Sequence, residues 1–467
     1  MKTLISILLF SATTLPLSAQ NTKDGGITAD MLKTIKSEAK SPSDKAIFNA
    51  ISNNSIDNLA RTRESQNEVD AYFSVETKKQ SITNQKSSGR CWMFSGLNVL
   101  RGNLTKRTDS LSCVFSHDYL FFWDQLEKAN LCLQGMIDTA KKPMDDDDVR
   151  FFFRSPLGDG GTFCGVADLA DKYGLVPKSV VPETFASEST SRMSSLIKSK
   201  LREYGLQLRR MVAQGKKPAD IKAAKTKMLA TVYHMLSLTL GEPPTEFTYA
   251  FRDASGKAIT PAKNYTPMSF YEEVMGGKKL TGSFVMLMND PRRPYHKTYQ
   301  VQWDRHTYDG QDWCYLNLPM EEIEEIAIKV LKDGTKMYSS YDAGKFLDRK
   351  RGVADLNNFD YGSLFSTTFP MTKAERIETF DSGSTHAMTL TAVDLDANGK
   401  PLKWAVENSW GADSGYKGYV IMTDEWFREY MFRLVVDKQY LSEDIIKEAA
   451  QKPLIVSPED PLFAEDE

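Results

Sequence analysis

The chain has 467 residues, of which 41% are hydrophobic and 26% are charged, so it can fold around a large core and is not intrinsically disordered. Its formal net charge of −3 is too close to neutral for the whole surface to bind nucleic acid or an anionic membrane. Only a local basic region could serve such a partner.

The first residues have the order of a secretory signal peptide. Lys2 is followed by an apolar run over residues 4–10 and by small residues up to Ala19. The run is too short to span a bilayer comfortably, and Gln20 follows the expected cleavage site where a lipid anchor would need a cysteine. We therefore predict that residues 1–19 are a signal peptide and that the mature protein is periplasmic or secreted, with no membrane partner.

The number of cysteines is odd, which leaves at least one thiol unpaired in an exported protein. The cysteines are Cys91, Cys113, Cys132, Cys164 and Cys314. Neither C-x-x-C nor a paired histidine spacing occurs, so the sequence predicts no structural zinc site and no redox dithiol. We expect no metal and no cofactor.

Apolar residues recur at helical spacing over about 91–185, and short alternating runs such as SFVMLMN, KTYQVQW and GYVIM follow from about 281 onward. Helices first and strands last predict an α+β fold with two layers packed face to face. The predicted segments are 1–19 as signal peptide, 20–60 as a polar N-terminal arm, 61–185 as a helical subdomain, 186–280 as a mainly helical insertion, 281–452 as a β-rich subdomain and 453–467 as a C-terminal arm.

One region is strongly basic. Ten basic residues stand against two acidic ones between Lys198 and Lys227. On amphipathic helices such a run usually forms the solvated face, and the alternative is a surface for phosphate backbones or for an acidic partner.

Cys91 is the strongest candidate for a catalytic group. It lies just before a stripe of apolar residues at helical spacing, Met93, Leu97, Leu100 and Leu104, and the preceding SSG supplies a cap and a turn. A cysteine in the first turn of a helix meets unpaired N–H groups and the positive end of the helix dipole, which favour a thiolate and so a strong nucleophile.

A cysteine nucleophile needs a base, and His386 and Asn408 stand at the far ends of two alternating runs joined by DANGK. If a five-residue loop centred on Asn398 closes this hairpin, His386 faces position 410 and Asn408 lies one step away on the same face. A two-residue Asn-Gly turn would shift the register and place the two side chains on opposite faces. In the first register, the Asn408 oxygen accepts one ring N–H and leaves the other nitrogen for Cys91.

Gln85 lies six residues before Cys91. Its amide N–H could join the Cys91 backbone N–H in stabilising an oxyanion, and the alternative is a solvated loop glutamine.

These motifs resemble a known family. QKSSGRCWMFSGLNVLR, THAMTLTAVDL and KWAVENSWG are similar to the active-site motifs of papain-like cysteine peptidases. His386 follows Cys91 by 295 residues, against about 130–150 in the short papain branch, which leaves room for a large insertion. Further blocks, from SPLGDGGTFCGVADLADKYG to MTDEWFREYMFRLVVDKQYL, resemble the branch of bleomycin hydrolase and aminopeptidase C over roughly residues 45–462.

The resemblance implies a papain-like fold with a large helical insertion and a C-terminal arm. It implies Cys91 as nucleophile, His386 as general base and acid, Asn408 as the residue that orients the ring and Gln85 as oxyanion donor. Members of this family form hexameric barrels, and their C-terminal arm lies in the cleft, where its terminal carboxylate, Glu467 here, can pair with the substrate's α-ammonium. The acidic ending AEDE departs from the small apolar residues usual in the family.

We therefore expect a cysteine aminopeptidase that acts on peptides through a thioester at Cys91. A ring-forming nucleic-acid-binding protein that uses residues 198–227 is the alternative from another class, and the neutral net charge weighs against it. An endopeptidase or an acyltransferase on the same scaffold is a third possibility.

Overall fold

The computed structural model describes residues 25–38, 42–107, 113–253 and 255–463. The predicted signal peptide at 1–19 and the predicted substrate-binding residue Glu467 lie outside these residues. The chain forms two compact units, one of residues up to Arg61 together with Tyr361–Ser366, and one of Thr62–Asp360 together with Thr367–Glu467.

The smaller unit is helical. Its helices are α1 (Ala29–Glu38), α2 (Asp44–Ile51), α3 (Ile56–Ala60) and α13 (Tyr361–Phe365). The Tyr361 hydroxyl donates to Asp57 at 2.9 Å and so ties α13 to α3 across 304 positions of sequence.

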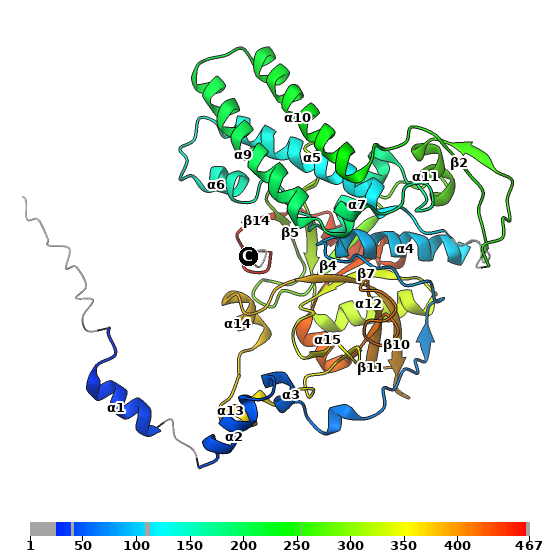
Figure 1. The fold of residues 1–467 in the computed structure, drawn as a ribbon. Helices are drawn as coiled ribbons and strands as arrows, with labels where there is room; N and C mark the ends of the chain where they lie inside the picture. Colours follow the sequence, from blue (N-terminus) through cyan, green and yellow to red (C-terminus); the bar gives the residue numbers. More distant parts are fainter. Residues whose placement is uncertain (1–24, 39–41, 108–112, 254, 464–467) are drawn as a thin grey trace, which may run out of the picture. The chain divides into compact units, whose positions relative to one another are not determined.

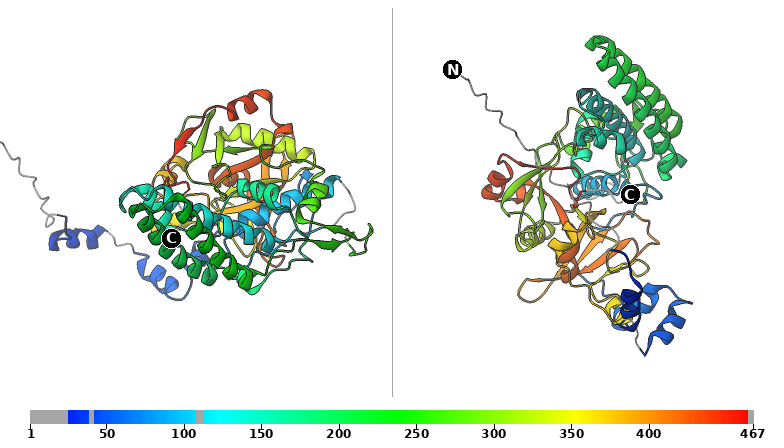
Figure 2. Two further views of the ribbon diagram at one scale, coloured as in Figure 1. Left: turned by 90° about the horizontal axis from the view of Figure 1, so that it is seen from above. Right: turned by 90° about the vertical axis from the view of Figure 1, so that its left-hand side faces the viewer.

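Helices form one side of the larger unit (Figure 1). They are α4 (Cys91–Arg107), α5 (His117–Asp138), α6 (Asp147–Arg154), α7 (Phe163–Tyr173), α8 (Phe185–Glu188), α9 (Ser191–Ala213), α10 (Pro218–Leu240) and α11 (Pro267–Met275). A short turn joins α9 to α10. Gly215 in this turn has a φ of +67°, a left-handed conformation that glycine adopts without strain. Pro218 occupies the first turn of α10, where a helix does not need its missing N–H group. The two long helices run side by side against α5 (Figure 2).

A twelve-stranded mixed sheet forms the other side, in the order β14-β5-β6-β4-β13-β7-β10-β11-β12-β9-β8, with β1 paired to β10. The strands are β1 (Val75–Glu76), β4 (Phe284–Met288), β5 (Lys297–Val301), β6 (Cys314–Asn317), β7 (Met337–Tyr341), β8 (Leu347–Asp348), β9 (Val353–Ala354), β10 (His386–Leu395), β11 (Pro401–Glu407), β12 (Tyr419–Thr423), β13 (Met431–Asp437) and β14 (Leu454–Val456). A separate pair, β2 (Phe247–Tyr249) and β3 (Lys263–Tyr265), lies beside α11.

Shorter helices fill the connections of the sheet. They are α12 (Met320–Lys332), α14 (Lys373–Glu378), α15 (Asp424–Tyr430) and α16 (Glu443–Ala449), with single 3₁₀ turns at Glu64–Gln66 and Lys438–Tyr440. Helices and strands thus pack as the two layers that the sequence predicts, and the α+β fold class is confirmed.

Helix α4 lies between the two layers. The stripe from Met93 to Leu104 is buried as predicted, but Trp92 and Phe94 on other faces are buried as well. The reason is that α5 and α7 cover one side of α4 while β7 and β10 cover the other. A side chain at Gly96 would bring its Cβ within 2.7 Å of Val166, so glycine permits the close approach of α7.

The β10–β11 hairpin has the register that a five-residue loop requires. Asp396 N donates to Lys400 O at 2.8 Å across the loop, and Thr389 faces Glu407 near the other end. A bulge between Leu390 and Ala392 shifts the register by one residue. A second irregularity, between Asp394 and Leu395 next to the loop, restores the original register. Both ends therefore keep the same register, which places Asn408 on the same face as His386.

A buried ion-pair network joins α4 to the end of this hairpin. Glu407 accepts from Lys336 at 2.8 Å and from Arg101 of α4 at 3.4 Å, and all three side chains are buried. Because Glu407 directly precedes Asn408, the network fixes the end of β11 against the helix that begins at Cys91.

The substitution Glu407→Gln keeps the size of the side chain but removes the carboxylate that Lys336 and Arg101 share in this buried network. We expect a loss of about 3 kcal/mol in the free energy of unfolding. Urea denaturation followed by tryptophan fluorescence measures it, with Glu425→Gln on the exposed side of α15 as a control within about 0.5 kcal/mol of wild type. Equal stabilities of the two variants would contradict a role for the network.

Candidate active site

Cys91 occupies the first position of α4. The Arg90 carbonyl accepts from the N–H groups of Met93 and Phe94 at 3.0 Å. These hydrogen bonds form the first turn of the helix, which contains Cys91. The thiol is partly buried. None of the five cysteines forms a disulfide, and all five lie in the described part of the chain.

His386 and Asn408 are hydrogen-bonded to one another. His386 Nε2 donates to Asn408 Oδ1 at 2.9 Å, and the same oxygen accepts from the Ser409 N–H at 2.7 Å, which holds the amide in place. The Trp410 ring stacks on the imidazole, with 4.7 Å between ring centroids. These contacts fix the ring plane and leave Nδ1 as the nitrogen that can accept a proton.

Hydrogen bonds between α4 and β10 hold the helix that begins at Cys91 against the strand that begins at His386. Ser95 Oγ, one turn after Cys91, donates to the Ala387 carbonyl at 2.9 Å, and Thr389 Oγ1 donates to the Ser95 carbonyl at 3.2 Å. The Ala387 N–H interacts with the Cys91 sulfur. The thiol therefore meets the backbone of the residue that follows His386.

A second set of hydrogen bonds places Gln85. Its backbone N–H donates to the Ser409 carbonyl at 2.8 Å, and its side-chain oxygen accepts from Ser409 Oγ at 2.6 Å. Gln85 Nε2 donates to the Ser88 carbonyl at 2.6 Å, which occupies one of its two hydrogens. The other hydrogen remains for a group bound next to Cys91.

Burial dominates the electrostatics of the pair. It raises the pKa of the Cys91 thiol and lowers the pKa of His386 to about 4, because each would carry a lone charge in a poorly solvated site. The N–H groups of Ala387 and Trp92 lower the pKa of Cys91. Transfer of a proton from sulfur to imidazole creates both charges together, so each offsets the burial penalty of the other.

Arg433 is a further charge near the thiol, and sequence reasoning missed it. Its guanidinium lowers the pKa of Cys91, whereas the Asp159 carboxylate raises it. Arg433 stacks on Trp313 at 3.8 Å from the ring centroid, is only 8% exposed, and its Nε has no hydrogen-bond partner within the described ranges. A lone arginine in a strand carries no motif, so its place is visible only in three dimensions.

The C-terminal arm is held by charges and by one aromatic ring. Asp460 pairs with Arg292 at 2.8 Å and with Arg293 at 2.6 Å. The Phe463 ring packs on Trp313 at 5.2 Å between centroids. The Arg433 guanidinium lies 5.7 Å from the centre of the same Phe463 ring, so the arm shares a neighbour with the thiol.

Two further buried histidines, His306 and His117, have other surroundings. His306 bonds Asp124 at 2.5 Å and packs on Trp92, while His117 is buried and stacks on Phe94. Among the described residues, no group of three or more His, Cys, Asp or Glu side chains could hold a metal ion.

The basic stretch from Lys198 to Lys227 lies on α9 and α10. Several of its donors are engaged within the chain: Arg209 donates to the carbonyls of Thr139 and Lys142, and Lys225 donates to Asn130 and Gln134. Within the described residues, no helix is both long and apolar enough to cross a membrane.

Comparison with known proteins gives the class. A sequence profile of the Peptidase C1-like family matches residues 26–463. The chain is 36% identical to aminopeptidase C of Lactobacillus delbrueckii subsp. lactis over 431 residues, which cover 91% of this chain and 95% of the relative. It is 37% identical to human bleomycin hydrolase over 403 residues, which cover 84% of this chain and 87% of the relative.

A solved structure agrees with these relatives. The crystal structure of PepW from Lactobacillus rhamnosis HN001 superposes with a TM-score of 0.89 at 37% identity, and covers 94% of this chain and 99% of that one. A cysteine peptidase fold with a cysteine, a histidine and an asparagine brought together defines the class of the protein. The chain belongs to the Peptidase C1-like family, and the predicted resemblance is confirmed.

The influence of Arg433 on the thiol can be measured by alkylation. Loss of its charge in Arg433→Gln raises the pKa of Cys91, so less thiolate is present at pH 7 and iodoacetamide reacts more slowly, by roughly threefold or more. Mass spectrometry of the Cys91 peptide gives the rate, and the exposed Cys314 in the same sample is the internal control. Arg433→Lys keeps the charge and should restore the rate. Equal alkylation rates in wild type and Arg433→Gln would show that the Arg433 charge does not affect the pKa of Cys91.

Proposed function

We propose that the protein is a cysteine aminopeptidase that removes N-terminal residues from peptides through a thioester at Cys91. The observation that carries the proposal is the joined geometry of α4 and β10, in which the thiol meets the Ala387 backbone beside a histidine held by Asn408. The relatives named aminopeptidase C support the choice of aminopeptidase within the family.

In the proposed reaction, His386 Nδ1 takes the proton from Cys91, and the sulfur attacks the carbonyl carbon of the peptide bond. The Cys91 N–H and the second hydrogen of Gln85 Nε2 bind the oxyanion that forms. When the C–N bond breaks, His386 returns the proton to the leaving amine and a thioester remains on Cys91. Water then gives a proton to His386 and attacks the thioester, which releases the N-terminal residue and restores the thiol.

The arm supplies the proposed preference for N-termini. Its ion pairs at Asp460 and the packing of Phe463 hold it near Arg433, and the chain continues from there for four more residues, of which three are acidic. We propose that a carboxylate at the end of the arm, such as the terminal group of Glu467, pairs with the α-ammonium of the substrate. Such a charge-assisted contact in a secluded cleft selects for a free N-terminus.

We also propose that residues 1–19 direct export to the periplasm or beyond, and that the protein assembles as a hexamer. The support for export is the order of charged, apolar and small residues in this segment. The support for the hexamer is the family resemblance, and size-exclusion chromatography with light scattering would test it.

Loss of the oxyanion donor should slow turnover. Gln85→Ala removes one hydrogen bond to the developing charge, so kcat on aminoacyl-aminomethylcoumarin should fall by about 10²- to 10³-fold with a smaller change in KM. Gln451→Ala on the exposed surface is the matched control and should behave as wild type.

Cys91→Ala should abolish this turnover, since no thioester can form. Hydrolysis that persists undiminished in Cys91→Ala would remove the thiol from the reaction and refute the proposed function.

Deletion of residues 463–467 tests the arm. Without Phe463 and the acidic end, hydrolysis of substrates with a free N-terminus should fall by roughly tenfold, the effect of one lost charge-assisted contact, and N-acetylated peptides should become substrates. Deletion of residues 464–467 alone keeps Phe463 and separates the acidic end from the packing of the arm. Unchanged selectivity in both deletions would show that the arm does not select the N-terminus.

A further inference from the structure

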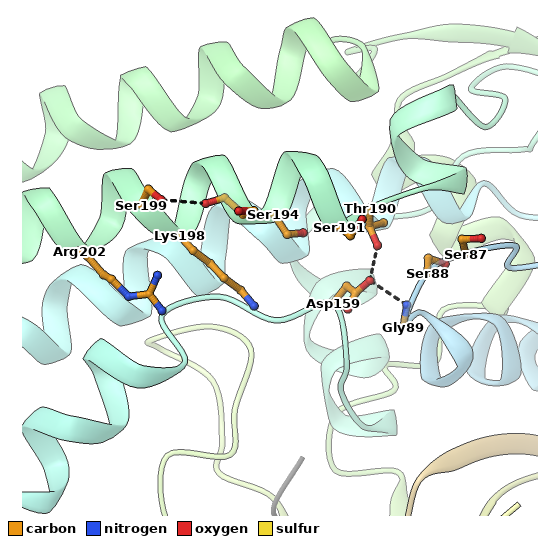
Figure 3. Close-up of a pocket in the computed structure, with 11 residues that line it drawn as sticks. Ser87, Ser88, Gly89, Asp159, Thr190, Ser191, Ser194, Lys198, Ser199 and Arg202 are labelled. Atoms are coloured by element: carbon orange, nitrogen blue, oxygen red, sulfur yellow. Dashed lines mark hydrogen bonds between the residues drawn. The ribbon is translucent and has the colours of Figure 1, made fainter. Parts of the chain in front are cut away.

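A polar pocket of about 500 Å³ adjoins the loop that leads to Cys91 (Figure 3). One wall is the backbone of Ser87, Ser88 and Gly89, which connects Gln85 to the nucleophile. The opposite wall is the first three turns of α9, and the Asp159 loop closes the space between them. The pocket therefore begins two residues from Cys91.

Several polar groups in the wall already have partners. Asp159 Oδ2 accepts from the Gly89 N–H at 2.7 Å and from Thr190 Oγ1 at 2.5 Å. Arg202 donates to the carbonyls of Phe153 and Arg154 at 2.9 and 3.0 Å, where it ends helix α6. These groups build the wall and hold it in place.

Two donors in the wall have no partner. Lys198 extends from α9 into the pocket (Figure 3), and within the described ranges its ammonium has neither a hydrogen-bond nor an ion-pair partner. The Ser194 hydroxyl, one turn earlier on the same side of α9, also lacks a partner among the described residues, although the side chain is only 7% exposed. A buried hydroxyl without a hydrogen bond is unfavourable, so a ligand that supplies one is stabilised here.

We propose that this pocket binds a carboxylate of the peptide substrate, with Lys198 as the cation and Ser194 as a hydroxyl donor. The charged side chains of the lining are Lys198, Arg202 and Asp159, whose sum is one positive charge, which matches a carboxylate better than a doubly charged phosphate. The inference rests on the proposed peptidase function and adds a substrate class to it: peptides with an acidic group near the scissile bond.

The carboxylate can come from two parts of a peptide. It is either the side chain of an aspartate or glutamate next to the scissile bond, or the C-terminal carboxylate of a short peptide. The two sources are distinguished by matched substrates. One series places Glu or Gln on either side of the scissile bond, and the other compares free and amidated C-termini of the same dipeptide and tripeptide.

The experiment measures kcat/KM of wild type, Lys198→Met and Lys200→Met on these pairs. Lys200 is the matched control, because it lies on the same helix but outside the pocket lining and pairs with Glu203 at 2.7 Å. Wild type and Lys200→Met should prefer the carboxylate member of one pair by about tenfold or more, as one charge-assisted hydrogen bond provides. Lys198→Met should lose this preference through KM and keep its rate on the neutral member.

Ser194→Ala should reduce the preference in part, because one donor is lost while the charge remains. Equal preference in wild type and Lys198→Met, with the neutral peptides still hydrolysed, would overturn the pocket proposal and leave the peptidase function intact.

Titration calorimetry with Cys91→Ala tests the pocket without turnover. The Glu peptide should bind about tenfold more tightly than the Gln peptide, and Lys198→Met in the same background should remove the difference. Absence of Cys91-dependent hydrolysis together with this binding preference would refute the proposed function alone. Equal binding of the two peptides and of their amidated forms would refute the carboxylate pocket.

Discussion

The attachment of α4 to β10 is the constraint on which the proposed chemistry depends. Ser95 lies one turn below Cys91 and bonds the carbonyl of Ala387, which follows His386. A helix start and a strand start that are 295 positions apart in sequence are thereby held together. The same helix carries Arg101, whose ion pair with Glu407 holds the end of the strand that directly precedes Asn408. Cysteine, histidine and asparagine thus share one rigid support.

This support makes a buried proton transfer possible. Burial disfavours a lone thiolate and a lone imidazolium, so neither group is activated by its surroundings alone. In the proposed reaction the two charges arise together, and the N–H groups of Ala387 and Trp92 and the guanidinium of Arg433 favour the thiolate. Asn408 and Trp410 contribute by fixing the ring, so little reorganisation is needed when the proton moves.

Much of this arrangement can be predicted from local sequence signals. The turn DANGK indicates a hairpin centred on Asn398, and the observed register agrees with it at both ends. The bulge between them could not be predicted, and it is harmless to the site because a second irregularity restores the register. The helical stripe indicates α4 but not its burial on all sides, since the covering helix α7 and the strand β7 come from distant parts of the chain.

Other features have no local signal. Arg433 acts on the thiol from β13, and the pocket beside Ser87 to Gly89 arises only when α9 packs against the Asp159 loop. In the sequence, Lys198 is one of ten basic residues in a run that reads as a solvated face. The fold distinguishes it from the others, because only Lys198 and Arg202 of these ten residues line the pocket, and Arg202 already donates to two carbonyls.

The central claim is that the His386 imidazole is charged only when the Cys91 thiolate is beside it. NMR titration of protein labelled with ¹³C-histidine, with His386→Gln to assign the signal, measures this directly. In Cys91→Ala, burial should keep the pKa of His386 near 4, so the ring stays neutral from pH 8 to pH 5. In wild type, the ring should be protonated at pH 6 because the thiolate raises its pKa. The same titration midpoint in both proteins would contradict the account.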